Sequence, residues 1–166
     1  MPVRLTTPEE IFSFKLGAAL TMETTILGML DDLEQNAQRE ELRELFSEHA
    51  AETKQHVANI EKSFELLGEK VEPSPCPTIE GLKEEGTTTI AMTDNSIVDA
   101  VLLAGAGETE HHEIAVYETL VTNAEARGAS DVAELLKQNL QQEQAALEKV
   151  KTMGTKISTE GIAVAV

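Results

Sequence analysis

Two glutamates one helical turn apart, Glu110 and Glu113, interrupt the apolar pattern of the segment AGAGETEHHEIAVYETLV. Apolar residues at spacings of three and four predict one helix over residues 96–127, with both carboxylates on its buried face. An unpaired buried carboxylate costs several kcal/mol, and no Lys or Arg lies on this face. A metal ion is therefore the first candidate for neutralising the pair. The apolar positions that define the face are Ile97, Val101, Ala104, Ile114, Tyr117, Leu120 and Ala124.

A single glutamate interrupts the apolar stripe of two further predicted helices. The first helix, residues 8–34, carries Glu23 in the middle of its stripe, and the last, residues 131–153, carries Glu143 in the same relative place. Either glutamate alone would be interpreted as a side chain turned out to solvent. Their agreement with the interruption at Glu110 makes a shared polar layer the better interpretation.

The remaining long helix is predicted over residues 39–67, ending at a glycine, and its stripe is broken by two kinds of metal-binding side chain. Glu52 and His56 lie one turn apart on the apolar face, and His49 lies nearly one turn before Glu52. A lone histidine on such a face is usually a hydrogen-bonded core residue. The adjacent glutamate favours His56 as a ligand, whereas His49 is the weaker candidate.

Four amphipathic helices predict an all-α, single-domain four-helix bundle that spans residues 1–166. The proline-rich segment 69–95 is too long for a simple turn and is expected to cross the bundle, so that the helix after it runs parallel to the helix before it. One short helix is expected within it, over residues 79–85. The tail, residues 155–166, is weakly patterned and is expected to be partly ordered or docked at an interface.

In such a bundle the mid-helix positions meet at one level, which brings together five carboxylates and one imidazole. Their charge of about −5 approximately matches two metal ions of charge +2 or +3. Carboxylate-rich ligation with an imidazole suits iron or manganese better than zinc, which prefers Cys and His, or calcium, which prefers oxygen ligands. The expected cofactor is therefore two iron ions, with manganese as the alternative.

Composition limits the class of protein. The chain has 166 residues, of which 41% are hydrophobic, enough for one compact domain with a sizeable core. A net charge of −17 argues against partners such as nucleic acid or an anionic membrane surface. With one cysteine, no signal peptide and no apolar run long enough to cross a bilayer, the expected compartment is the cytoplasm.

Four stretches carry a resemblance to the YciE/YciF-type branch of the ferritin-like superfamily, which comprises small bacterial stress-associated proteins. They are HAAETKQHVANIEKSFELLG at 49–68, CPTIEGLKEEG at 76–86, EHHEIAVYETL at 110–120 and AELLKQNLQQEQAALEKV at 133–150. The resemblance covers nearly the whole chain and implies a ferritin-like four-helix fold, a homodimer and a rubrerythrin-like metal site. Carried over residue by residue, it implies the metal ligands Glu23, Glu52 with His56, Glu110 with Glu113, and Glu143.

The chain departs from the usual di-iron pattern of Glu-x-x-His on two helices. Glu52 is four residues before His56 rather than three, and no histidine follows Glu143. Either one ion is held less firmly, or His49 or His111 reaches the site from elsewhere.

Three residues near these motifs have open roles. Tyr117 either donates a hydrogen bond to a ligand carboxylate or packs in the core with its hydroxyl satisfied. His112 is expected at the surface. Cys76, in the proline-rich loop, is expected to be a half-buried structural residue, with a redox thiol as the alternative.

Two functions from different classes remain open. The first is a di-iron or di-manganese enzyme that consumes peroxide or oxygen, with Glu113 and Tyr117 in catalytic roles. The paired CxxC motifs of a rubredoxin module are absent, so this enzyme needs an external electron donor, or a disproportionation like that of manganese catalases. The second is a non-catalytic stress protein, a scaffold or metal-sequestering protein, in which the metal is structural or merely stored. Iron storage in a large cage is the weaker third interpretation.

Overall fold

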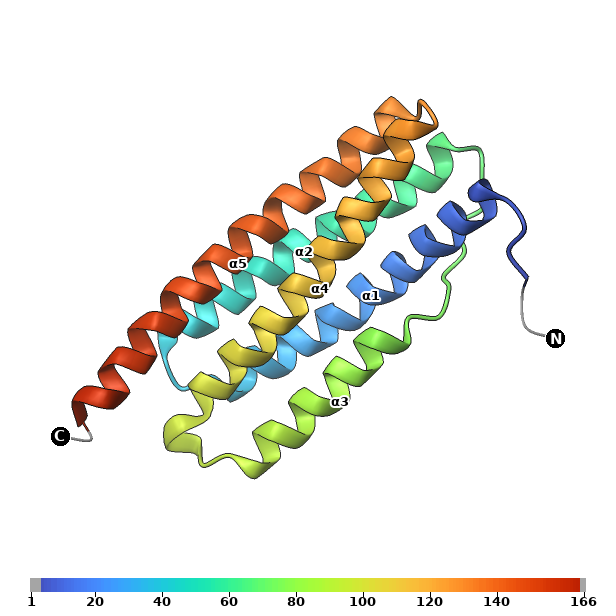
Figure 1. Ribbon diagram of the computed structural model, residues 1–166. Helices are drawn as coiled ribbons and strands as arrows, with labels where there is room; N and C mark the ends of the chain where they lie inside the picture. The colour runs from blue at the N-terminus through green and yellow to red at the C-terminus, as the bar shows by residue number, and fades with distance from the viewer. Residues whose placement is uncertain (1–3, 165–166) are drawn as a thin grey trace.

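The computed structural model describes residues 4–164, and within that range the chain forms five α-helices and one 3-10 turn (Figure 1). One antiparallel hairpin consists of α1 and α2, and a second consists of α4 and α5; α2 packs on α5, and α1 packs on α4. The predicted four-helix bundle is confirmed. The elements are α1 (Pro8–Asn36), α2 (Glu40–Leu66), α3 (Pro77–Met92), η1 (Asn95–Ile97), α4 (Val98–Ala126) and α5 (Ser130–Val164).

Local sequence signals set the ends of the helices. Thr7 and Glu10 form the capping box of α1: the Glu10 amide donates to Thr7 Oγ1 at 3.1 Å, and the Thr7 amide donates to Glu10 Oε2 at 3.2 Å. Gly68 and Gly128 follow α2 and α4 with φ of 71° and 74°, a left-handed conformation that glycine adopts without steric cost. These predicted boundaries are confirmed.

The long connection between α2 and α4 crosses the bundle and makes these two helices parallel, as predicted (Figure 1). Its first part passes directly over α1 at Gly17, where a Cβ atom would lie 2.4 Å from the carbonyl oxygen of Glu72 and 2.6 Å from Ser74 Oγ. Only glycine lets the loop approach α1 this closely. The connection is thereby fixed against the helix that carries Glu23.

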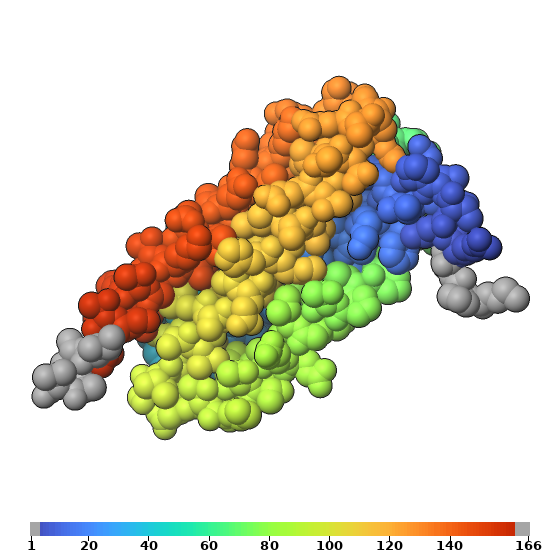
Figure 2. Space-filling model, viewed as in Figure 1, coloured from blue at the N-terminus to red at the C-terminus, as the bar shows by residue number. Residues whose placement is uncertain are grey.

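The second part of the connection, α3, is longer than the predicted helix over 79–85. The added turns contain threonines, which have low helix propensity, and their hydroxyls donate to carbonyls one turn back, as in Thr87 to Lys83 at 3.0 Å and Thr89 to Glu85 at 2.7 Å. Ile79 is fully buried beneath it. Figure 2 shows the green surface of α3 lying against the yellow surface of α4.

The expectation of a partly ordered tail is wrong for residues 155–164, because α5 continues without a break to Val164. Ion pairs hold this extension to the start of α2: Lys156 Nζ lies 2.7 Å from Glu41 Oε1, and Arg39 lies 2.5 Å from Glu160. Residues 165 and 166 of the predicted tail, like residues 1–3, lie outside the described residues.

The core is apolar above and below its centre, and its register in α4 differs from the prediction. Ile97, expected on the buried face, is 63% exposed, whereas Val98 and Leu102 are buried with 1% exposed. The first half of α4 is apolar on several faces, so packing against its neighbours rather than the pattern selects the buried one. Within residues 4–164, no helix combines the length and apolar character needed to cross a membrane.

Candidate metal centre

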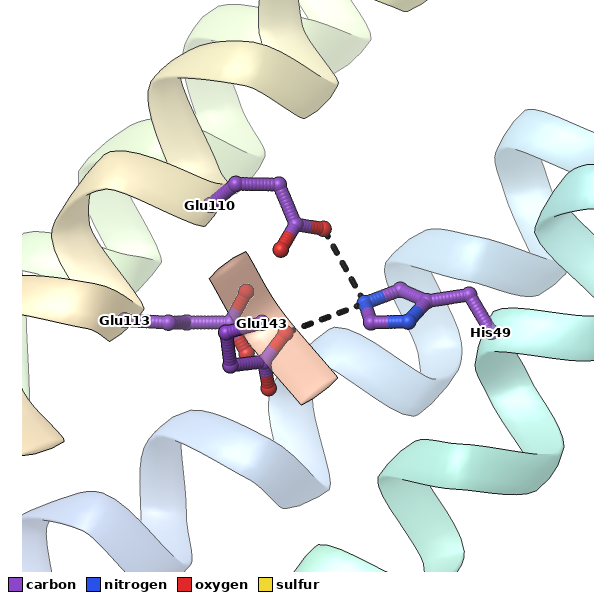
Figure 3. A group of neighbouring side chains, drawn as sticks. All are labelled: His49, Glu110, Glu113 and Glu143. Carbon is purple, nitrogen blue, oxygen red and sulfur yellow. Dashed lines mark ion pairs between the residues drawn. The ribbon is translucent and has the colours of Figure 1, made fainter. Parts of the chain in front are cut away.

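A polar layer crosses the middle of the core and draws on all four helices of the bundle. Figure 3 shows the part of it that comes from α2, α4 and α5. Its six side chains are 0–5% exposed. Each sits at the break in an apolar stripe, so the same packing that buries the helix also buries the polar group. They are Glu23 from α1, His49 and His56 from α2, Glu110 and Glu113 from α4, and Glu143 from α5.

One half of the layer is built around His49. Its Nε2 atom lies 3.0 Å from Glu110 Oε1 and 3.4 Å from Glu143 Oε2, as Figure 3 shows. Glu113 points into the same space from α4. One ligand atom from each of these four residues lies within 4.8 Å of the others, which is close enough for all of them to contact one ion.

The other half is built around His56. Its Nδ1 atom lies 2.8 Å from Glu143 Oε1 and 3.5 Å from Glu23 Oε1. These three residues form a second group whose ligand atoms lie within 4.8 Å of one another. Glu143 belongs to both groups and turns one oxygen to each histidine, which is the arrangement of a carboxylate that bridges two ions.

Both histidines are held through the nitrogen that faces away from the carboxylates. His49 Nδ1 lies 3.1 Å from Glu52 Oε2, and His56 Nε2 lies 2.7 Å from Gln142 Oε1. Since both partners are acceptors, these nitrogens carry the protons in the neutral rings, and the lone pairs point into the layer. Metal-binding histidines show this arrangement, in which a hydrogen bond on one nitrogen orients the other toward the ion.

The buried oxygens in the layer have too few donors. Both oxygens of Glu113, both of Glu143, and Oε2 of Glu23 and of Glu110 are buried without an aligned hydrogen bond, and the short contacts to histidine are ion-pair distances only. Buried polar atoms in folded proteins nearly always have a partner. The donor set of four carboxylates and two imidazoles therefore fits two divalent cations, which would balance the charge.

The metal-free site holds protons in place of metal charge. Burial, followed by the charges of Glu143, Glu23 and Glu110, raises the pKa of Glu113 well above its usual range. Burial and neighbouring carboxylates raise the pKa of Glu143 to about 8, although contact with His56 opposes this.

Burial lowers the pKa of both imidazoles, but the surrounding carboxylates have a larger, opposite effect, so both pKa values are raised. The Glu110 and Glu143 carboxylates raise the pKa of His49 to about 9. The Glu143 and Glu23 carboxylates raise that of His56 to about 10. Ligation would displace these protons, so metal affinity is expected to rise with pH.

Five of the six predicted ligands are brought together, and Glu52 lies outside both groups. Its side chain is 32% exposed and accepts from His49 instead. Residues 49 and 56 are seven apart and differ in direction by about 20° on a helix, whereas residue 52 is turned by roughly 40–60° from both toward the edge. His49, the alternative considered from sequence, occupies the place expected for Glu52.

The other histidines lie outside the layer. His111 is exposed on α4 and lines a groove between α4 and α5, so it does not complete the site. His112, expected at the surface, is half-buried, and burial and the charge of Lys15 lower its pKa. Cys76 is half-buried at the start of α3, as its structural interpretation predicts.

Tyr117 is fully buried, and its hydroxyl donates to Glu23 Oε1, which is the first of its two predicted roles. Burial and the charge of Glu23 raise its pKa well above the usual value. Sequence reasoning missed two polar residues behind it, Asn59 and Asn139, which are both buried. Their position one turn from His56 and one turn from Glu143 was the available signal.

Comparison with known proteins assigns the chain to a family. Residues 7–163 match a family described as Domain of unknown function (DUF892). The chain is 34% identical to Protein YciF of Escherichia coli (strain K12) over 145 residues, which are 86% of this chain and 87% of YciF. In structure it is similar to YcfI from Rhodopseudomonas palustris, with a TM-score of 0.88 and 31% identity over 92% of this chain and 98% of that one.

The solved structure of the E. coli stress protein YciF is equally similar, with a TM-score of 0.88 and 30% identity over 93% of this chain and 99% of that one. These matches cover both hairpins and the crossover, and they confirm the YciE/YciF-type resemblance and the all-α, ferritin-like fold. The chain therefore belongs to the DUF892 family of YciF-like proteins.

Proposed function

We propose that this protein binds two redox-active ions, iron or alternatively manganese, in the polar layer and uses them to reduce peroxide or oxygen. The observation that carries the proposal is Glu143, a fully buried carboxylate shared by two groups that each contain one histidine. A structural site for one ion needs neither the second histidine nor the shared carboxylate. Two adjacent ions need both.

The choice of metal follows from the donor set. Each group offers one imidazole and two or more carboxylates, with no sulfur ligand. This mixture suits iron or manganese, whereas structural zinc sites favour Cys and His and calcium takes oxygen ligands. Four buried carboxylates also balance the charge of two divalent ions, and Glu52 lies outside this set at the edge of the layer.

When bound, two adjacent ions supply the two electrons that cleave an O–O bond, so that one peroxide and two protons yield two waters. An external electron donor must then return both electrons. The chain contributes position: Glu143 spans the two groups, and Glu52 and Gln142 orient the histidines. Glu113 is the residue proposed to move during the reaction, because neither of its oxygens has a hydrogen bond, and it lacks the ion pairs with His49 and His56 that hold Glu143.

The test is to load the protein anaerobically with Fe²⁺, add hydrogen peroxide, and follow oxidation by stopped-flow absorbance. We expect oxidation much faster than that of free Fe²⁺, and repeated turnover when a reductant is supplied. Glu113→Ala is expected to slow oxidation more than it weakens binding, whereas the exposed neighbour change Glu108→Gln serves as the matched control. If the loaded protein oxidises no faster than iron in buffer while keeping two ions, the metal is structural or sequestered.

The expected homodimer belongs to the same proposal. Sedimentation of metal-free and loaded protein would measure the mass of the assembly. A monomer in both states would remove this part of the proposal without affecting the site.

A further inference from the structure

We propose that Tyr117 is a positioning residue that keeps one coordination position open at the ion held by Glu23, His56 and Glu143, and that Asn139 and Asn59 are oriented so that neither accepts its hydroxyl proton. The inference rests on the proposed two-ion site and adds where on it a small oxygen or nitrogen ligand binds. It begins with hydrogen bonds that lie behind the metal-binding side chains, on the side of α2 and α5.

A continuous chain of hydrogen bonds runs from the surface to Glu23. Gln55 Nε2 donates to Asn59 Oδ1 at 2.9 Å, and Asn59 Nδ2 donates to Asn139 Oδ1 at 2.8 Å. Asn139 Nδ2 donates to the Tyr117 hydroxyl at 3.0 Å, and that hydroxyl donates to Glu23 Oε1. Gln55 is exposed, whereas the other members are 0–5% exposed.

The direction of this chain is fixed by a backbone carbonyl. Asn139 Nδ2 also lies 3.3 Å from the carbonyl oxygen of His56, and a carbonyl can only accept. The NH₂ of Asn139 must therefore face His56 and Tyr117, and its oxygen must face Asn59. With the Tyr117 oxygen accepting from Asn139, the single hydroxyl proton of Tyr117 is directed at Glu23.

This direction determines how Glu23 can bind an ion. Its Oε1 atom is occupied by the Tyr117 proton, and its Oε2 atom is buried with no hydrogen-bond partner. A carboxylate held in this way offers one oxygen to a metal rather than two. Tyr117 thus acts on the ion through Glu23, without contacting it, and Asn139 leaves the Tyr117 proton free to be donated to Glu23.

The two ion positions then differ in the number of protein ligands. Four residues surround the His49 position, whereas three surround the His56 position. Since a redox or Lewis-acid metal needs a free position to bind its substrate, the site assigns a small ligand, such as peroxide or an anion of similar size, to the His56 position.

The experiment uses the full chain loaded with Co²⁺, whose visible spectrum reports coordination number, titrated with azide in the absence of turnover. We expect two Co²⁺ and one azide per chain. Tyr117→Phe keeps the ring but frees Glu23 Oε1 to chelate, so azide affinity should fall by about tenfold, the equivalent of one hydrogen bond to a charged group, while two Co²⁺ remain bound.

Two substitutions of Asn139 distinguish the direction of the Tyr117 hydrogen bond from the packing around it. In Asn139→Asp, the new carboxylate accepts the Tyr117 proton and releases Glu23, so azide affinity should fall as in Tyr117→Phe. In Asn139→Leu, Tyr117 can still donate to Glu23, so azide affinity should stay within about threefold of wild type, well inside the value of one such hydrogen bond. Gln55→Ala, at the exposed end, is the control and should change nothing.

The outcomes are distinct. If wild type binds fewer than two Co²⁺ at saturation, the two-ion proposal fails and this inference fails with it. If two Co²⁺ bind but Tyr117→Phe leaves azide affinity unchanged, or if wild type binds two azides, only the positioning role is overturned. Tyr117→Phe retains the buried ring, so this arm stands even if both Asn139 variants fail to fold.

Discussion

The two halves of the polar layer use the same ligand types in different surroundings. At His49, the outward nitrogen donates to Glu52, a carboxylate that is 32% exposed, so this half reaches the surface. At His56, the outward nitrogen donates to the amide oxygen of Gln142, and every metal-facing side chain is 0% exposed. When the outward N–H of an imidazole bonds to a charged carboxylate rather than a neutral amide, the other nitrogen becomes more basic and binds a metal ion more strongly. The comparison teaches that two similar groups in one core can hold ions of unequal affinity and unequal access.

The largest effect is expected where the two halves meet. Glu143→Ala removes the shared ligand, so binding at both positions should fall and metal should no longer raise the melting temperature. An ion at a hundred times its Kd stabilises the folded state by about 2.7 kcal/mol, and that gain should be lost. Calorimetry with and without Fe²⁺ or Mn²⁺ measures it. Glu148→Ala, exposed on the same helix, is the control, and retention of two tightly bound ions in Glu143→Ala would contradict the bridging role.

Removing either histidine should separate the halves. In His49→Ala and in His56→Ala, we expect metal analysis to find one strongly bound ion per chain in place of two, because each variant keeps every residue of the other group. His49→Ala keeps one imidazole and two carboxylates, and His56→Ala keeps one imidazole and three carboxylates. The two variants should differ in exchange rate, with the ion left in His49→Ala released more slowly because it lies deeper. Identical binding and release in both variants would remove the asymmetry.

The metal-free protein should lose stability as pH rises. The raised pKa values of His49 and His56, about 9 and about 10, give stability that is complete below about 6.5 and lost as pH rises through these values. The pKa of Glu143 is raised from an ordinary 4.5 to about 8, so the free energy of unfolding also falls as pH rises from 4.5 to about 8. Both effects have the same sign.

Melting curves in a chelator from about pH 5 to pH 10 measure this slope. With metal bound, ligation replaces the protons and the slope should become shallower, since higher pH favours metal binding. A metal-free protein whose melting temperature rises across this range would contradict the assignment of protons to the layer.

The smallest effect is expected from the partners of the histidines. Glu52→Gln keeps the hydrogen bond to His49 but removes the charge, so metal affinity at that position should fall roughly tenfold to a hundredfold, with two ions still bound at saturation. Gln142→Glu makes the opposite change at His56 and is the matched comparison. Competition with a chromogenic chelator measures both. Loss of a whole ion in Glu52→Gln would instead make Glu52 a direct ligand, as the family resemblance implied.

The sequence was sufficient for the course of the four long helices, because their periodicity is strong. The Thr7–Glu10 capping box also marks the start of α1, and Gly68 and Gly128 mark the ends of α2 and α4. It was also sufficient for the polar layer, since four interruptions at matching depth define one level of a bundle. Which side chain on α2 faces inward was not predictable, because His49, Glu52 and His56 all lie within one broad face and only packing separates them by tens of degrees.

Other features depended on contacts between distant segments. The continuation of α5 past residue 154 depends on pairs such as Lys156 with Glu41, which no local pattern in the tail reveals. The bonds from Asn59 to Asn139 and on to Tyr117 join α2, α5 and α4. Asparagine is neutral to unfavourable inside helices. Its presence at two positions on buried helix faces is therefore the one local sign that each has a hydrogen-bond partner on another helix.

The extension of α5 behaves energetically as a separate unit from the rest of that helix. It packs on the core through the partly buried Met153 and Ile157, and its other described contacts with α2 are ion pairs of Lys156 and Glu160 between side chains that are 34–47% exposed. Such exposed pairs stabilise a protein by about 0–1 kcal/mol each, and added salt weakens them. The Debye length is about 10 Å at 0.1 M and shortens as the ionic strength rises. Amide hydrogens beyond Ile157 should therefore exchange with solvent by local fraying, faster at high ionic strength. Those around Glu143 should exchange only when the bundle opens, at a rate that salt leaves nearly unchanged.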